Sequence, residues 1–390
     1  MKEIGILEYH YHSIFFYTIA RICNTKQTNV TLFTTKRIYS FIEKHLENKK
    51  QYKIVLKKDN ESINSFLKRV EKICNDNIDL LFINTIQESC KDLPFYLKFK
   101  PKCKMILTIH DANTWLKQKF TVNILRPFAT IDTIISTVLI NRFILKKFNA
   151  INVIYSPIKE YIINNTSYKK EVFTLPFTIF DNTKKITRKR KENTIKFIVP
   201  GAIIQTRRNN DVVLDAFENL FKRYKNKISL FLLGSPTGSY GQRIINRCKK
   251  MKEKNYNITF FEEYVPEEIY DKTLRECDTI IVPIKLATRS LGVIKETFGM
   301  TKASGVIFDA IQYAKPLIVP SEFKIIKEIQ SSTSHYLNSE DLEKKIAELI
   351  KNKEKLFNLE KEAYKNSKNF SLNILQDYFI KNIIQKLNNL

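Results

Sequence analysis

The chain has little glycine and little proline, with 8 and 11 of them among 390 residues. Collagen-like, fibrous and low-complexity proteins contain far more of both, so the composition excludes these classes. No window offers the roughly 20 uninterrupted apolar residues of a membrane-spanning helix. The apolar fraction of 43% is still enough for a folded core, and the chain exceeds the size at which one core stops growing. We therefore expect a folded protein of two domains.

Several motifs of common enzymes are absent. There is no GxxxxGK[ST] phosphate loop, no G-x-S-x-G elbow and no HExxH zinc motif. There is also no D-x-D pair, the usual carboxylate pair for a divalent ion on a nucleotide-sugar. These absences remove support for nucleotide hydrolysis, α/β-hydrolase chemistry and zinc proteolysis. We expect no metal and no resident cofactor.

The cysteines form no C-x-x-C pair and have no histidine at metal-ligand spacing, so we expect buried thiols in a reducing cytosol. They are Cys23, Cys74, Cys90, Cys103, Cys248 and Cys277. The first residues, MKEIGILEYHYH, predict a strand rather than a signal peptide. A cytoplasmic location is the expectation.

Acidic residues are scarce relative to basic ones: 40 against 66, for a formal net charge of +26. Such a charge attracts nucleic acid, an anionic membrane or phosphorylated substrates. The basic residues are scattered and no nucleic-acid motif appears, so no nucleic-acid partner is expected. The apolar stretch Pro127–Asn141, flanked by Arg126, Arg142, Lys146 and Lys147, has two interpretations. It is either a core helix under a sheet or a surface that rests on the inner, anionic face of a membrane.

Short apolar segments alternate with amphipathic helical patterns, which predicts βαβ units and a mostly parallel sheet. The expected strands are Ile4–Glu8, Val30–Thr34, Tyr52–Leu56, Leu80–Asn84, Met105–Ile109, Asn152–Tyr155, Val172–Leu175, Ile195–Val199, Ser229–Leu233, Ile258–Phe261, Thr279–Val282 and Leu317–Val319. The fold class is therefore α/β, with two Rossmann-like, doubly wound domains that face each other across a cleft.

The alternation stops at 181–194, a polar and strongly basic segment that predicts a linker. The expected domains are residues 1–180 and 195–370. The last helix, 371–390, carries Leu375, Phe379, Ile383 and Leu387 at four-residue steps. Such an apolar stripe must pack on something, and we expect it to return to the first domain.

The second domain is expected to hold phosphate. Gly201 ends a buried strand, and Arg207 and Arg208 follow in the loop before a helix beginning at Asn210 or Asp211. Two guanidiniums at the carboxyl end of a parallel strand suit a diphosphate, although a solvated charge pair is the alternative.

A second loop and helix add further candidates from Glu296 to Pro320. Glu296 could accept hydrogen bonds from sugar hydroxyls, and Asp309 could hold a ribose. Ser304 and Gly305 open a helix whose free N–H groups favour an anion, with Lys302 as a nearby charge. An exposed loop carboxylate and a solvent-facing helix position are the alternatives for the two acidic residues.

In the first domain, His110 and Asp111 follow the predicted strand Met105–Ile109. His110 could contact the reacting sugar or act as a general base, and Asp111 lies on the same, acceptor side. His12, after the first strand, is a weaker acceptor-side candidate because no glycine-rich fingerprint accompanies it. A structural histidine is the alternative at both positions.

These segments resemble glycosyltransferases of the GT-B fold, in the large retaining group that uses nucleotide-activated sugars (family-4-like, or glycosyl transferases group 1). The similarity lies in VPGAIIQTRRNNDVVLDAF, YVPEEIYDKTLRECDTIIVPI and ETFGMTKASGVIFDAIQYAKPLIVP, and in the first half only in TIHD. The family's second Glu corresponds to Ser304 by its spacing from Glu296, or to Asp309 when counted back from Pro316.

The resemblance implies a donor site in the second domain and an acceptor site in the first. It implies a UDP- or GDP-linked sugar, a glycan or lipid-linked acceptor, and a leaving phosphate that draws off the acceptor proton. Glu296 and His110 are the candidate catalytic residues. The expected protein is a hexosyltransferase of polysaccharide biosynthesis, cytoplasmic or peripheral at the membrane. The alternatives are a nucleic-acid-binding protein, a silent partner subunit of the same fold, and a nucleotide-sugar epimerase.

Overall fold

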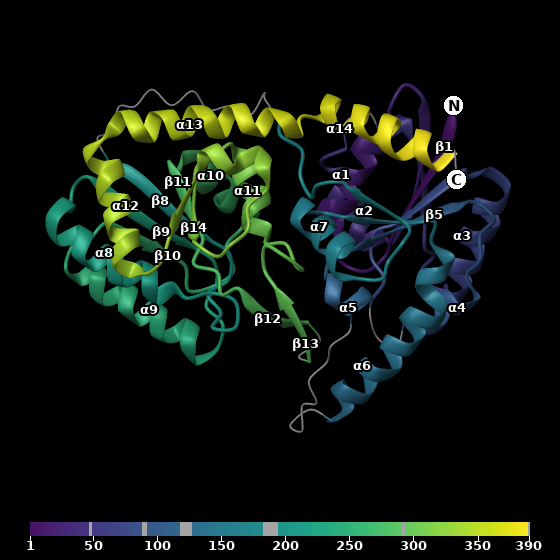
Figure 1. Cartoon of the computed structure of the whole chain (residues 1–390), viewed down its shortest axis with the longest axis horizontal. Helices are drawn as coiled ribbons and strands as arrows, with labels where there is room; N and C mark the ends of the chain where they lie inside the picture. The colour runs from purple at the N-terminus through teal and green to yellow at the C-terminus, as the bar shows by residue number, and fades with distance from the viewer. Residues whose placement is uncertain (47–48, 88–91, 118–126, 182–193, 291–292, 389–390) are drawn as a thin grey trace. The chain divides into compact units, whose positions relative to one another are not determined.

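The computed structural model describes residues 1–46, 49–87, 92–117, 127–181, 194–290 and 293–388. Of the predicted linker, 181–194, only the two end residues are among the described residues, and Cys90 is not among them. Two compact units form, and each has its own sheet (Figure 1). The first unit contains residues 1–179, 289–303 and 372–390, and the second contains 180–288 and 304–371.

The first unit is built on a seven-stranded parallel sheet in the order β3-β2-β1-β4-β5-β6-β7. Its strands are β1 (Lys2–Glu8), β2 (Thr28–Thr34), β3 (Tyr52–Leu56), β4 (Leu80–Ile83), β5 (Lys104–Ile109), β6 (Ala150–Val153) and β7 (Glu171–Thr174). Its helices include α1 (Ser13–Cys23), α2 (Lys36–Glu43), α3 (Ile63–Asn77), α4 (Leu93–Lys98), α5 (Ala112–Leu116), α6 (Pro127–Leu139) and α7 (Ser156–Asn165). A strand that is buried on both faces consists of consecutive apolar residues, so such strands can be predicted from the sequence.

The second unit has a six-stranded sheet in the order β10-β9-β8-β11-β14-β15, and its described pairs are also parallel. Its strands are β8 (Ile195–Pro200), β9 (Ile228–Leu233), β10 (Ile258–Phe260), β11 (Thr279–Ile281), β14 (Leu317–Pro320) and β15 (Thr333–Tyr336). Its helices are α8 (Asn210–Tyr224), α9 (Gly238–Glu253), α10 (Glu267–Glu276), α11 (Gly305–Tyr313), α12 (Ser339–Lys351) and α13 (Lys353–Ser367). Figure 1 shows α8, α9 and α12 on one face of this sheet and α10 and α11 on the other. The two parallel sheets confirm the predicted α/β class.

The C-terminal helical segment packs within the first unit. It consists of α14 (Leu372–Tyr378), a π-helical turn and α15 (Gln385–Asn388). The four residues of the apolar stripe are buried, and the Phe379 ring lies 6.1 Å from that of Phe82. The Gln376 amide also donates to the carbonyl oxygens of Arg21 and Asn24 at the end of α1.

Three differences from the predicted strands have local causes. The strand predicted at Asn152–Tyr155 is instead Ala150–Val153, because Tyr155 precedes α7 and Pro157 favours the first turn of that helix. The edge strand β15 is polar and lacks an alternating pattern, so its sequence carries no strand signal. A small two-stranded sheet, β12 (Ala287–Ser290) with β13 (Ile294–Thr297), was likewise not predicted.

Candidate functional site

In the second unit, the loop after β8 holds both predicted arginines at the carboxyl edge of the sheet. Gly201 turns the chain with a φ of +93°, a backbone conformation that favours glycine. The loop then runs beside the end of β11, because Asn209 N donates to Pro283 O at 2.7 Å and Lys285 N to Arg207 O at 2.9 Å. Ligands of doubly wound sheets bind at this edge.

The guanidinium of Arg208 lies directly over Gly201. A Cβ atom at position 201 would be 2.9 Å from Arg208 Cζ, so a larger residue would displace the arginine. Arg208 Nε donates to Ala202 O at 3.0 Å, whereas Nη1 is buried and has no hydrogen-bond partner. Burial lowers the pKa of Arg208, while Tyr270 and Asp309 act to raise it. A buried cationic donor without a partner is suited to bind an anion.

Asp309 and Tyr270 complete a cluster with Arg208. The Tyr270 hydroxyl, on α10, donates to Asp309 Oδ2, on α11, at 2.9 Å. Burial raises the pKa of Asp309 to about 6, although the hydrogen bond from Tyr270 and the charge of Arg208 lower it. We call Arg208, Tyr270 and Asp309 the Arg208 cluster. Tyr270 was not predicted from the sequence, where it is one more residue of a polar amphipathic helix.

The start of α11 is open to solvent. Ser304 precedes the helix, is buried, and makes no capping hydrogen bond with its side chain. No acidic residue lies in the first turn, and a Cβ atom at Gly305 would meet nothing within 4 Å. Backbone N–H groups next to open space can receive a phosphate. Arg207 is exposed on its loop.

In the first unit, His12 and His110 stack at the carboxyl edge of the sheet, with ring centroids 4.2 Å apart and planes 22° apart. Burial is the main cause that lowers the pKa of His12 to about 3, and the neighbouring His110 lowers it further. Burial also lowers the pKa of His110. Both imidazoles are therefore neutral at physiological pH, and each has one nitrogen that can accept a proton.

Asp111 and Lys302 are paired in the first unit. Lys302 Nζ lies 2.7 Å from Asp111 Oδ2, and the Ser290 hydroxyl donates to the same oxygen. Asp111 Oδ1 is buried and has no partner. Lys302 was predicted as a charge near the donor phosphate, and in the structure its charge is already balanced by this carboxylate.

Glu296 caps a helix of the first unit. Only 1% of the residue is exposed, and its carboxylate accepts hydrogen bonds from Thr114 N (2.9 Å), Thr114 Oγ1 (3.0 Å) and Asn113 N (3.4 Å) at the start of α5. Burial raises the pKa of Glu296 to about 7, with a further contribution from Asp111. The predicted contact with a sugar remains a prediction. The alternative of an exposed loop carboxylate is wrong, because the segment 289–303 packs into the first unit.

Three buried polar residues at the carboxyl edge of the same sheet, Glu8, Asn84 and Thr85, were not predicted. Glu8, at the end of β1, accepts from Thr85 Oγ1 at 2.6 Å and from His10 N at 2.7 Å. Asn84, just after β4, is fully buried, and neither its amide oxygen nor its amide nitrogen has a partner. His110 Nε2 lies 3.3 Å from Asn84 O. β1, β4 and β5 are neighbours in the sheet, and only the strand order reveals that residues after these strands meet.

The predicted site residues thus form two groups, one in each unit. Gly201, Arg208 and Asp309 meet in the second unit, which also carries Ser304 and Gly305 at the start of α11. The first unit carries the others: His12, His110, Asp111, Glu296 and Lys302. Within the described residues, no three His, Cys, Asp or Glu side chains are grouped as they would be to hold a metal ion.

No protein-family model and no curated protein matches the sequence. Solved structures do match over nearly the whole chain. Sucrose-phosphate synthase from Thermosynechococcus elongatus overlaps with a TM-score of 0.62 at 11% identity, covering 100% of both chains. The N-terminal domain of trehalose-6-phosphate phosphatase from Candida albicans overlaps with a TM-score of 0.61 at 12% identity, covering 98% of this chain and 96% of that chain. MnaA from S. aureus, in its co-structure with UDP, overlaps with a TM-score of 0.55 at 13% identity, covering 100% and 98%.

At such low identity these similarities concern the fold alone. They agree with the two parallel Rossmann-like sheets, one of seven strands and one of six. The chain therefore has the GT-B fold that its sequence motifs predicted.

Proposed function

We propose that the protein transfers a sugar from a nucleotide-sugar, UDP- or GDP-linked, to a glycan or lipid-linked acceptor. The observation that carries the proposal is the buried, unpartnered Nη1 of Arg208 beside Asp309 of α11. Fold similarity to a protein solved with UDP supports the same ligand class.

In the proposed donor site, the diphosphate accepts hydrogen bonds from Arg208 and from the first N–H groups of α11. Arg207, exposed on the same loop, supplies a second guanidinium. Asp309 retains lone pairs beyond the hydrogen bond from Tyr270 and accepts from a ribose hydroxyl. The two guanidiniums and the N–H groups of α11 favour the negative charge that develops on the leaving diphosphate, which lowers the barrier to breaking the bond between sugar and diphosphate.

In the proposed acceptor site, the neutral pair His12–His110 orients the acceptor hydroxyl. Retention of configuration follows if the leaving phosphate itself takes the hydroxyl proton on the same face of the sugar. That route needs no carboxylate base, which agrees with a Glu296 already engaged as a helix cap.

Calorimetric titration with UDP-, GDP-, ADP- and CMP-sugars tests the donor site. We expect one nucleotide class to bind, and Arg208→Ala to weaken that binding at least about tenfold, since charged hydrogen bonds contribute about 1.5–3 kcal/mol. Arg223→Ala is the matched control, because Arg223 is an exposed arginine of the same unit that pairs with Glu343 on the protein surface. Equal affinity of Arg208→Ala and the unsubstituted protein would contradict the proposal.

A nucleotide-sugar epimerase of the same fold is the principal rival. Product analysis separates the two activities. A transferase releases free nucleotide only as the sugar joins an acceptor or water, whereas an epimerase returns an intact nucleotide-sugar with an altered sugar. A protein that binds but converts no nucleotide-sugar would be the silent partner subunit.

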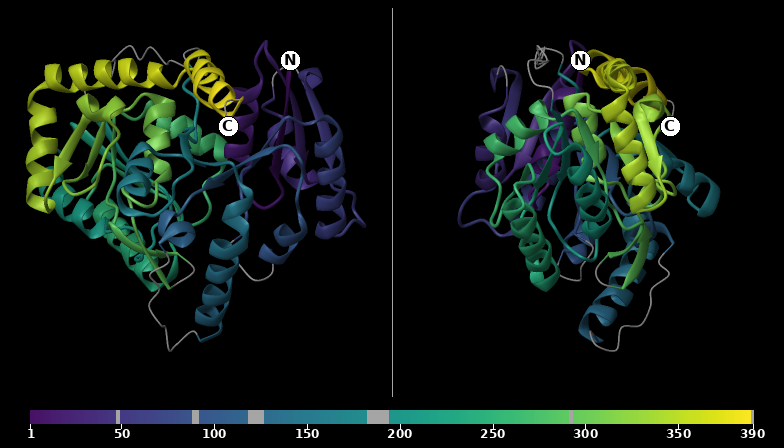
Figure 2. Two further views of the ribbon diagram at one scale, coloured as in Figure 1. Left: turned by 45° about the vertical axis from the view of Figure 1, so that its right-hand side comes forward. Right: turned by 90° about the vertical axis from the view of Figure 1, so that its left-hand side faces the viewer.

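We further propose that α6 rests on the anionic face of a membrane. Figure 2 shows α6 extending away from the sheet of its unit. Its apolar side chains face solvent rather than the core, which contradicts the interpretation of this stretch as a core helix. Their exposed fractions are 86% for Phe128, 54% for Ile131, 39% for Ile134, 47% for Ile135 and 50% for Val138. The hydroxyl residues Thr130, Thr133 and Ser136 are buried instead.

In a normal surface helix the apolar face packs on the core and the polar face meets water. The reverse arrangement of α6 is typical of a helix that lies at a membrane surface. Arg142 and Lys146 are exposed just after α6 and can approach anionic headgroups, whereas Lys147 is engaged with the carbonyl oxygens of Tyr96, Leu97 and Phe99. No helix in the described part of the chain is long and apolar enough to cross a bilayer.

Sedimentation with liposomes tests the membrane proposal. We expect more recovery with anionic than with neutral vesicles, and a loss in the double variant Phe128→Ser/Ile135→Ser. Phe357→Ser is the control, since Phe357 is 57% exposed on α13, outside this surface. Equal recovery of all variants on both vesicle types would reject the proposal.

A further inference from the structure

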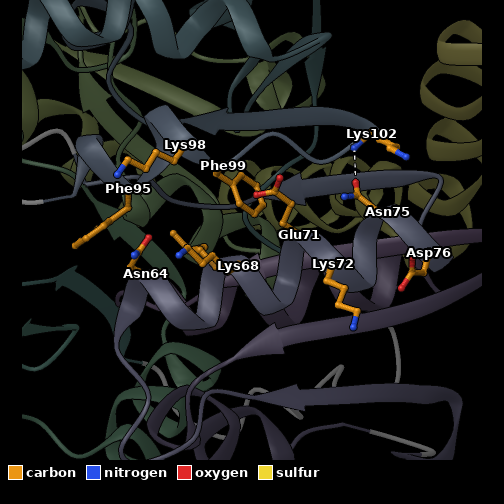
Figure 3. Close-up of a pocket in the computed structure, with 11 residues that line it drawn as sticks. Asn64, Lys68, Glu71, Lys72, Asn75, Asp76, Phe95, Lys98, Phe99 and Lys102 are labelled. Atoms are coloured by element: carbon orange, nitrogen blue, oxygen red, sulfur yellow. Dashed lines mark hydrogen bonds between the residues drawn. The ribbon is translucent and has the colours of Figure 1, made fainter.

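Two cysteines lie next to each other at the amino-terminal edge of the first sheet. Cys74 is in the last turn of α3, and Cys103 directly precedes β5. Two hydrogen bonds flank the pair. Lys102 N donates to Asn75 Oδ1 at 2.7 Å, as Figure 3 shows, and Lys104 N donates to Asp79 O at 3.2 Å. The residues on either side of Cys103 are thus joined to Asn75, next to Cys74, and to Asp79, just after α3, which places Cys103 beside the end of α3.

Both thiols line one cavity of about 390 Å³. Three lysines, Lys2, Lys102 and Lys104, line it as well, together with Ile384 and Leu387 of the C-terminal segment. Cys74 is 1% exposed, whereas Cys103 is half-buried. A reagent small enough for the cavity can therefore reach Cys103 first.

The two thiols differ in acidity. A hydrogen bond between the side chains is the main cause that raises the pKa of Cys74 and lowers that of Cys103. Burial raises the pKa of both thiols, and the charges of Glu71 and Asp79 act in the same direction on Cys74 and Cys103 respectively. The partly exposed cysteine is thus the better nucleophile, and its buried neighbour keeps its proton.

We propose that Cys103 and Cys74 form a redox-active pair in which a hydroperoxide oxidises Cys103 and Cys74 resolves the product to a reversible disulfide. The Cys103 thiolate attacks one peroxide oxygen and the O–O bond breaks. A sulfenic acid forms at Cys103, and the other oxygen leaves with the former thiol proton as water or an alcohol. The Cys74 sulfur then attacks the Cys103 sulfur, the S–S bond forms, and the departing hydroxide takes the Cys74 proton as water. Two thiols are oxidised while one hydroperoxide is reduced.

The other described cysteines do not offer this arrangement. Cys23 and Cys248 are fully buried, and Cys277 donates its thiol hydrogen to Leu274 O. The pair lies at the amino-terminal edge of the sheet, whereas the proposed acceptor residues lie at the carboxyl edge. The inference therefore stands independently of the proposed transferase activity.

Peptide mapping of the full-length protein after treatment with hydrogen peroxide tests the pair. We expect one linked peptide joining Cys74 and Cys103, lighter than the two reduced peptides by the mass of two hydrogen atoms, which disappears on treatment with dithiothreitol. Before oxidation, iodoacetamide should modify Cys103 at least about tenfold faster than Cys23, because the thiolate is the reactive form. Cys90→Ser is the control variant and should still form the linked peptide, whereas Cys103→Ser should not.

Three results would overturn the inference. They are a disulfide that involves Cys90, oxidation of Cys103 to sulfinic acid without a linked peptide, or alkylation of Cys103 no faster than that of Cys23. The mapping uses the unsubstituted protein, so the test stands even if a variant fails to fold.

Discussion

The carboxylate of Glu296 accepts hydrogen bonds from both the backbone N–H and the hydroxyl of Thr114, at 2.9 and 3.0 Å, although 182 residues separate them. A third donor, Asn113 N, lies 3.4 Å away. The helix α5 begins at Ala112, and Asp111 before it makes no capping hydrogen bond with its side chain. A helix N-terminus needs acceptors for its free N–H groups. Glu296 supplies them from a distant part of the chain.

The Glu296 cap predicts a pH dependence of stability. Its pKa is raised from 4.5 to about 7, so the folded state retains a proton that the unfolded state loses. The contribution of this group to the free energy of unfolding is therefore full below pH 4.5 and is lost as the pH rises through 7, a change of about 3 kcal/mol. Glu296→Gln keeps a carbonyl acceptor but does not titrate.

Chemical denaturation at several pH values checks this prediction. The difference in the free energy of unfolding between the unsubstituted protein and Glu296→Gln should shift by that amount between pH 4.5 and 8. A difference that stays constant over this range would show that folding does not raise the pKa of Glu296.

Gly201→Ala should disturb the Arg208 cluster. An alanine at position 201 would have to adopt a φ of +93°, which is strained for any residue with a Cβ atom. Its methyl group would also collide with the Arg208 guanidinium. Gly238→Ala is the matched control, because its φ is also positive, at +65°, but its Cβ would meet nothing within 4 Å. We expect Gly201→Ala to lower the free energy of unfolding by about 2 kcal/mol more than Gly238→Ala does, which is the cost of overpacking. Thermal denaturation measures the difference, and equal losses would mean that Arg208 moves aside freely.

Tyr270→Phe should destabilise the second unit. It removes the hydroxyl that donates to Asp309 and leaves a buried carboxylate with one partner fewer, at a cost of about 1–3 kcal/mol. The loss should be larger above pH 6, where Asp309 is ionised, since its pKa is about 6. Tyr264→Phe, at a residue that is 81% exposed, should change little. Urea denaturation at pH 5 and pH 8 compares the variants, and a loss independent of pH would argue against the role of the hydrogen bond.

His12 should remain neutral down to low pH. Burial lowers its pKa to about 3, so its ring resonances in NMR spectra should not shift between pH 8 and pH 5. Because the unfolded chain binds the proton more readily, His12 contributes stability above pH 6.5 that is lost as the pH falls. Titration of a peptide spanning 8–16 provides the reference. A His12 resonance that shifts with the same midpoint as that of the peptide would contradict this environment.

Much of the fold follows from local patterns. The strands Tyr52–Leu56 and Ile195–Pro200 are mostly apolar segments between amphipathic helices, and the parallel sheets follow from that alternation. The loop with Gly201 and Arg208 could be assigned to a carboxyl edge because it follows such a strand. The hydrogen-bond partners of Glu296 could not be predicted in this way. Nothing near residue 296 indicates that its carboxylate caps α5, a helix that lies more than 180 residues earlier in the chain.

The sequence by itself determined the succession of strands and helices, and with it the two parallel sheets and the edge at which polar loops emerge. These features depend on the periodicity of neighbouring residues. Only the tertiary structure decided which of those polar groups meet: Arg208 with Tyr270 and Asp309, His12 with His110, and Cys74 with Cys103. Such contacts depend on the order of the strands in the sheet and on which side chains are buried away from water. The local sequence pattern specifies neither the strand order nor the burial.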